Sequence, residues 1–193
     1  MINDRLTEKA KSALNYAAES ALELGQNYVG TEHLLIGLVR ENDSVAGKIL
    51  EANNVTDDVV IEKIGNLIGV GEPITGISPE PTPRTKRVIQ SSYIEARRLG
   101  HSYIGTEHLL IATLRESESI AVKILLEMGV APQKLYNEIL GLLNENPGNA
   151  DEGEPQEARP ERGGKGGERG NEEKECSRKL SPARQARRLS GKR

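Results

Sequence analysis

Apolar side chains before residue 146 recur three and four positions apart, which is the spacing of amphipathic helices. In residues 8–24 the pattern is complete, with Thr7 before it suited to an N-cap and Gly25 after it suited to a left-handed stop. It predicts further helices over residues 31–41, 45–52, 56–68, 84–99, 107–116, 120–128 and 132–145. The other expected N-caps are Thr31, Ser44 and Thr82, and helices are also expected to begin at Thr56 and Thr106.

One stretch of seven residues occurs twice without change. Residues 30–36 read GTEHLLI, and residues 105–111 repeat these letters 75 positions later (105 minus 30). The same offset aligns residues 7–69 with residues 82–144 without a gap, so that matching residues continue through both segments. Segments this long and this similar fold alike, and the chain is therefore predicted to be a tandem duplication with a tail.

The predicted fold class is all-α, with two tandem four-helix repeats packed as one pseudo-twofold globule. Repeat 1 covers residues 1–69 and repeat 2 covers residues 82–145, and residues 70–81, rich in Gly and Pro, link them. Residues 146–193 lose the apolar pattern and consist largely of Gly, Pro, Glu, Arg and Lys. Such a composition buries too little apolar surface to offset chain entropy, so this tail is predicted to be disordered.

Charge and composition exclude several classes of partner. Residues 147–193 carry 12 Lys/Arg and 9 Asp/Glu, so the tail is +3 and the rest of the chain, at −3 overall, is −6. An acidic body argues against specific nucleic-acid binding. The chain has one cysteine, Cys176, and no apolar run long enough for a membrane span or a signal peptide. These features favour the cytoplasm, with no membrane partner.

The sequence lacks the motifs of an enzyme. It has no phosphate-binding loop of the P-loop type and no serine or cysteine with an evident His and Asp partner set. The three histidines lack metal-ligand spacing, and a metal site would require His33 and His108 to converge with further ligands. Each of these two histidines is better explained as a structural residue whose ring nitrogen bonds backbone in the first helical turn. No catalytic residue, metal or cofactor is predicted.

The two repeated helix starts are the candidate binding site. Thr31 and Thr106 mark positions with free backbone N–H groups, where the helix dipole favours anions. Glu32 and Glu107 beside them can each accept a bidentate hydrogen-bonded contact from a guanidinium. A ligand with both phosphate and guanidinium would suit such a site, provided that the carboxylates are within its reach. The alternative is that each glutamate only stabilises its own helix, by roughly 0.3–1 kcal/mol.

The repeated motif and its surroundings resemble the N-terminal double-repeat domain of the Clp family of AAA+ protein unfoldases. The residues that carry the resemblance are 6–10 (LTEKA), 30–35 (GTEHLL), 82–84 (TPR) and 96–101 (ARRLGH). The run LGHSYIGTEH at residues 99–108 most resembles the ClpC branch. The likeness covers about residues 3–145. Leu6 departs from the family, which often has Phe there.

The resemblance implies a non-catalytic module that binds protein substrates and adaptor proteins and docks them onto a Clp unfoldase ring. In ClpC-like proteins this domain also receives substrates marked with phosphoarginine. That role implies Glu32 and Glu107 as partners of the guanidinium. It implies a place near the phosphate for the threonines Thr7, Thr31, Thr82 and Thr106.

The family's two ATPase modules are missing from this sequence, which leaves three functional alternatives. The chain is expected to be a stand-alone adaptor-like protein, a regulator that sequesters adaptors or substrates, or a truncated or frame-shifted remnant of a ClpC subunit. An adaptor should raise the degradation of a marked substrate by a ClpC-like ring, whereas a sequestering protein should lower it.

Overall fold

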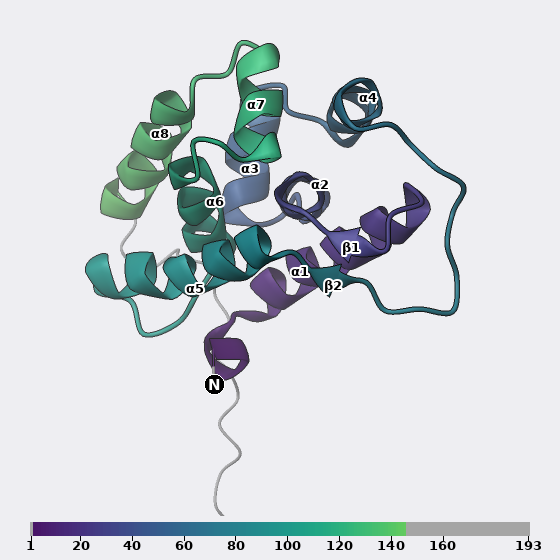
Figure 1. The fold of residues 1–193 in the computed structure, drawn as a ribbon. Coiled ribbons are helices and arrows are strands. Elements are labelled where there is room, and N and C mark those ends of the chain that lie inside the picture. Colours follow the sequence, from purple (N-terminus) through teal and green to yellow (C-terminus); the bar gives the residue numbers. More distant parts are fainter. Residues whose placement is uncertain (1, 146–193) are drawn as a thin grey trace, which may run out of the picture. The chain divides into compact units, whose positions relative to one another are not determined.

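The computed structural model describes residues 2–145 of the chain, with side chains for residues 4–144. Within this range the chain forms eight α-helices (Figure 1). The predicted helices are all present, and their ends lie within one residue of the prediction. The predicted disorder of residues 146–193 lies outside the described range. The helices are α1 (Glu8–Glu23), α2 (Thr31–Arg40), α3 (Val45–Ala52), α4 (Asp57–Leu67), α5 (Pro83–Arg98), α6 (Thr106–Arg115), α7 (Ile120–Glu127) and α8 (Pro132–Glu145).

Helices α2 and α6, which carry the duplicated motif, form the centre of the molecule (Figure 1). Every residue from Thr31 to Leu38 is buried in α2, and so is every residue from Thr106 to Leu114 in α6. A helix that is buried on all sides needs apolar residues around its whole circumference, which explains the runs LLI in both copies. The strict repetition of the motif therefore reflects two equivalent central positions.

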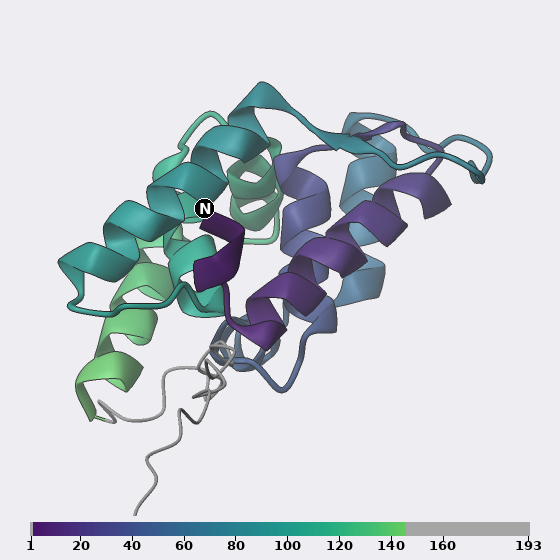
Figure 2. The same cartoon turned by 90° about the horizontal axis from the view of Figure 1, so that it is seen from below.

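The repeats share one core and exchange contacts across it. Helix α2 of repeat 1 packs against α7 and α5 of repeat 2, and α6 packs in the same way against α3 and α1. One continuous apolar cluster draws residues from both repeats, including Leu34, Leu50, Leu109 and Leu125. The all-α, pseudo-twofold arrangement predicted from the repeat is thereby confirmed. Figure 2 shows the two long helices α1 and α5 on the same face, with the N-terminal 3₁₀ turn (Ile2–Arg5) between them.

Two short parallel pairings of main chain, which the sequence did not predict, also join the repeats. Strand β1 (Tyr28–Val29), just before α2, pairs with β2 (Glu80–Pro81), just before α5. Leu6, before α1, forms the matching bridge with Ile104, before α6. Each pairing spans one or two residues, which is too short to produce a recognisable alternation of apolar and polar positions.

The helix ends mostly follow the predicted capping chemistry. The hydroxyls of Thr7, Ser44 and Thr82 each accept a backbone N–H three residues on, and Gly25 adopts a positive φ of 74°. Thr56 occupies the N-cap position of α4 without a side-chain cap bond. Among the described residues, no helix combines the length and the apolar character that crossing a membrane requires.

Candidate functional site

The main-chain pairings bring the six predicted site residues into two clusters. The N–H of Thr82 donates to the carbonyl of Val29 (3.0 Å), so α5 begins beside the start of α2. The N–H of Thr7 donates in the same way to the carbonyl of Ile104 (3.0 Å), which places the start of α1 beside that of α6. We call Thr31, Glu32 and Thr82 the first site, and Thr7, Thr106 and Glu107 the second site. Each site thus combines residues from both repeats.

The starts of α2 and α6 differ from the prediction. The N-caps are Gly30 and Gly105, in extended conformation, so that Thr31 and Thr106 are the first helical residues and not caps. A Cβ at Gly30 or Gly105 would collide with the carboxylate two residues on, so a larger residue there would displace that side chain. The side chain of Glu32 or Glu107 therefore folds back over its own N-cap glycine.

Both predicted carboxylates are buried in this structure, so neither faces solvent at its helix start. Glu32 is 2% exposed and Glu107 is 0% exposed. The cause is the exchange of contacts between repeats, because α2 and α6 are the central helices and their first turns are covered by the opposite repeat. The hydroxyl of Thr106, for example, accepts the backbone N–H of Ala46 at the start of α3 (3.3 Å).

His33 and His108 complete the two helix starts, as the structural interpretation of the histidines predicted. Nδ1 of His33 accepts the N–H of Gly30 (3.0 Å), and Nδ1 of His108 accepts that of Gly105 (2.9 Å). A neutral imidazole carries one proton, so Nδ1 as acceptor leaves the proton on Nε2. Each histidine thus satisfies the backbone N–H of its own N-cap glycine.

The four threonines play different parts. Thr7 and Thr82 cap α1 and α5 by accepting the N–H of Ala10 (3.2 Å) and of Thr85 (3.1 Å). Thr31 donates its hydroxyl to Oε2 of Glu32 (3.3 Å). Thr82 is partly exposed, while the other three threonines are buried.

Burial controls the protonation of these groups. Burial raises the pKa of Glu32, while bonds from its own backbone amide and from Thr31 act in the opposite direction. Burial lowers the pKa of His33 to about 4. Burial, with a smaller contribution from His101, lowers the pKa of His108 to about 3. Both rings are therefore neutral at neutral pH.

His101, which the sequence did not mark as a site residue, joins the second site. Its Nδ1 lies 2.8 Å from Nε2 of His108, and its ring stacks on that of Tyr103 with centroids 5.4 Å apart. The 75-residue offset pairs His101 with Gln26 (101 minus 75), so the repeat comparison contained a signal for this difference. In the described part of the chain, Oε1 of Gln26 and Nε2 of His33 have no hydrogen-bond partner.

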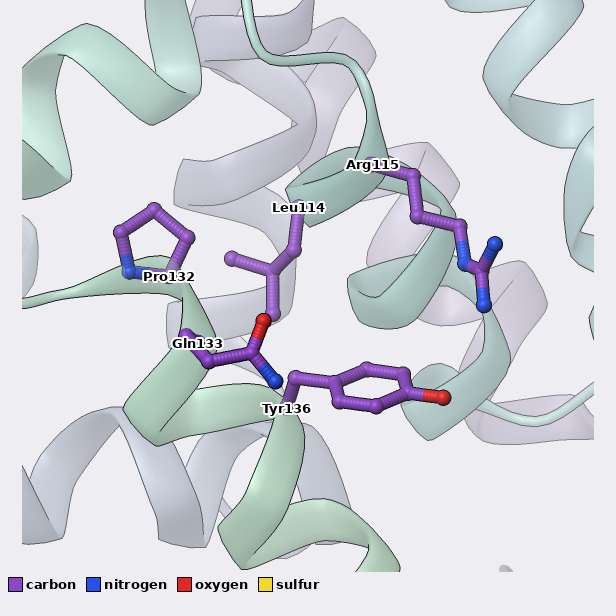
Figure 3. A pocket seen from close by; sticks show the side chains of 5 residues that line it. All are labelled: Leu114, Arg115, Pro132, Gln133 and Tyr136. Carbon is purple, nitrogen blue, oxygen red and sulfur yellow. The ribbon is translucent and has the colours of Figure 1, made fainter.

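Two surface hollows lie apart from both sites. One, of about 340 Å³, lies between the end of α6 and the start of α8 (Figure 3). Within it, the guanidinium of Arg115 lies 5.7 Å from the centre of the Tyr136 ring and is held by Glu95 (3.1 Å). The second, of about 360 Å³, lies between α3 and α8. Neither hollow is lined by any of the six predicted site residues.

Comparison with known proteins identifies the family to which this sequence is similar. The sequence profile of the family described as "Clp repeat (R) N-terminal domain" matches residues 5–125 and 82–162. The chain is 43% identical over 146 residues to "Negative regulator of genetic competence ClpC/MecB" of Bacillus subtilis (strain 168). That match covers 76% of this chain and 18% of the relative.

Two solved structures share the fold. The N-terminal domain of the chaperone ClpD from Arabidopsis thaliana superposes with a TM-score of 0.65 and 24% identity, covering 75% of this chain and 97% of that one. The ClpV N-domain in complex with a VipB peptide superposes with a TM-score of 0.56 and 21% identity, covering 73% and 88%. The molecule is thus a helical double-repeat domain of the kind found at the N-termini of Clp chaperones. The chain belongs to the Clp repeat N-terminal domain family.

Proposed function

We propose that the chain is a non-catalytic docking module that binds protein substrates and adaptor proteins for a ClpC-type unfoldase and protease. The family membership carries this proposal, and the solved ClpV N-domain with its VipB peptide supplies a precedent for peptide binding on this fold. The chain spans 18% of the length of the Bacillus relative, so an association with an unfoldase ring belongs to the proposal. The same holds for action in the cytoplasm.

A more specific proposal concerns the modified residue by which the module recognises its substrates. We propose that the first and second sites bind phosphoarginine, with Glu32 or Glu107 contacting the guanidinium. The phosphate would lie near Thr31 and Thr82 in the first site and near Thr7 and Thr106 in the second. At each site two helix N-termini converge, and the positive ends of both helix dipoles favour a phosphate there.

The buried carboxylates set a condition on this finer proposal. Glu32 and Glu107 must turn away from their N-cap glycines before a ligand can reach them. Leaving the helix start costs roughly 0.3–1 kcal/mol in lost dipole interaction. Each hydrogen bond between charged groups that forms with a guanidinium returns about 1.5–3 kcal/mol. The gain exceeds the cost only when a guanidinium is present. The carboxylates would therefore turn away from their glycines only when the ligand binds.

Calorimetric titration of the full chain with phosphoarginine tests this proposal. The variants Glu32→Gln and Glu107→Gln keep the shape of the side chain and remove its charge. Each is expected to lose one of two binding events, and the double variant is expected to lose both. Glu62→Gln, which changes an exposed glutamate on α4, serves as the matched control and should bind like the parent.

Unchanged affinity in the double variant would refute phosphoarginine recognition at these sites while leaving protein docking untouched. A degradation assay with a ClpC-like ring addresses docking itself. An adaptor raises the breakdown of a marked substrate, and a sequestering regulator lowers it. No effect on breakdown and no binding to the ring or the substrate would contradict both forms of the proposed function.

A further inference from the structure

The second site contains a pair of imidazoles whose ring nitrogens face each other. Nδ1 of His101 and Nε2 of His108 are 2.8 Å apart, and the ring planes are nearly perpendicular, at 85°. The Glu107 carboxylate lies against the same pair, with Oε1 3.2 Å from Nδ1 of His108. Within the described part of the chain, the ligand atoms of His101, Glu107 and His108 lie close enough together to bind one metal ion.

The nitrogen separation indicates which coordination geometry the pair can serve. Metal–nitrogen bonds are about 2.0–2.1 Å long, so two nitrogens at a right angle lie about 2.9 Å apart, and two at a tetrahedral angle about 3.3 Å apart. In the metal-free structure the 2.8 Å separation is that of a hydrogen bond, which a bound ion would replace, and it is closer to the right-angle value than to the tetrahedral one. Square-planar and octahedral ions such as Cu²⁺ and Ni²⁺ prefer such an angle and take nitrogen ligands.

Proton positions allow this coordination after one change of tautomer. In the metal-free state Nε2–H of His108 donates to Nδ1 of His101 because Nδ1 of His108 accepts the Gly105 N–H. When Nε2 gives its lone pair to a metal, the ring proton resides on Nδ1 instead. There it faces Oε1 of Glu107, which forms the carboxylate–histidine–metal arrangement common in metal sites. Metal binding therefore exchanges the bond from the Gly105 N–H to Nδ1 for a bond from Nδ1–H to Glu107. The number of bound protons does not change.

The residues around the two imidazoles would allow a metal ion to enter from solvent. His108 and Glu107 are fully buried, whereas His101 is partly exposed and forms the outer wall with Tyr103. Each imidazole binds a metal through the lone pair of a neutral ring. Water can complete the coordination from the side of His101.

We propose that His101 and His108 bind a divalent late transition-metal ion of the Ni²⁺ or Cu²⁺ type, with Glu107 holding the proton of the His108 ring. The first site lacks this ability, because Gln26 stands at the position of His101 and leaves His33 as a lone imidazole. The second repeat therefore carries a metal site within a framework that both repeats share. This site does not depend on phosphoarginine binding.

Titration of the chelator-treated full chain with Ni²⁺ by calorimetry tests the proposal. The parent is expected to bind one ion, and His101→Gln should weaken that binding at least tenfold. Gln is tolerated at the equivalent position of repeat 1, so this variant is expected to fold, which circular dichroism checks. The reciprocal variant Gln26→His should raise the stoichiometry from one ion to two. With Cu²⁺, the electron paramagnetic resonance spectrum of the parent should show coupling to two imidazole nitrogens.

Cys176 is present in the parent and in both variants, so a thiol-bound ion would bind equally to all three. Equal Ni²⁺ affinity in parent and His101→Gln would overturn the proposal. Unchanged stoichiometry in Gln26→His would overturn the claim that the second imidazole distinguishes the two sites. Tighter binding of Zn²⁺ than of Ni²⁺ would overturn the right-angle geometry.

Discussion

The two repeats begin their central helices with the same four residues but surround them differently. In repeat 1 the imidazole of His33 meets the Tyr28 ring edge-on and makes no hydrogen bond through Nε2 within the described residues. In repeat 2 the imidazole of His108 bonds His101, which in turn stacks on Tyr103. The duplicated part of the motif is the part that builds the helix start. The residues around it differ between the repeats and do not cap the helix.

The helix pairs behind these starts differ as well. Helices α1 and α2 approach so closely that a Cβ at Gly37 would collide with the backbone of Ala13. Repeat 2 has the buried Ala112 at the matching position of α6 (37 plus 75), and α6 packs against α5. The first pair is therefore packed backbone to backbone, and the second is separated by side chains. Equal motifs do not imply equal tolerance to substitution.

The largest expected effect concerns this packing difference. Gly37→Ala should destabilise the protein by about 3 kcal/mol, because its methyl group meets the main chain of α1 and not a movable side chain. The reciprocal change Ala112→Gly should cost only about 1 kcal/mol, the helix propensity difference. Urea denaturation measures both. Similar losses in the two variants would show that the helix pairs are packed alike.

A smaller effect should appear on acidification. His33 has a folded pKa of about 4 and an unfolded value near 6.5, so the unfolded chain binds the proton first as the pH falls. Its contribution to stability is thus complete above pH 6.5 and declines toward pH 4.

Between pH 7 and pH 5 the parent should lose about 2 kcal/mol more than His33→Gln, since Gln can also reach back to the N-cap amide. Urea denaturation across this pH range provides the measurement. Parallel pH profiles for parent and variant would contradict the buried, neutral state of His33.

The smallest expected effect concerns the lone imidazole. Gln26→His should stabilise the metal-free protein by about 1 kcal/mol, because it supplies an acceptor for the buried Nε2–H of His33. His101→Gln should cost a similar amount by weakening the bond to His108. Thermal unfolding in the presence of a chelator compares the two. A loss of stability in Gln26→His would show that the first site cannot accommodate the arrangement of the second.

Much of the fold could be predicted because it depends on local patterns. Thr7, Ser44 and Thr82 cap helices where their positions predicted, and Gly25 has the expected positive φ. The backbone bonds of His33 and His108 were also predicted. Thr31 was wrongly predicted as a cap, because threonine at a helix start ordinarily is one and the pattern does not reveal when glycine takes that position.

The sequence alone determined that the chain is a duplicated helical protein with two equivalent motifs, because helix periodicity and repetition are properties of the order of residues. The burial of Glu32 and Glu107 and the pairing of Leu6 with Ile104 depended on the tertiary structure. So did the contact between His101 and His108. Each of these features arises where two segments far apart in sequence, or on opposite sides of a turn, meet. The packing of one repeat against the other decides which side chains remain within reach of solvent.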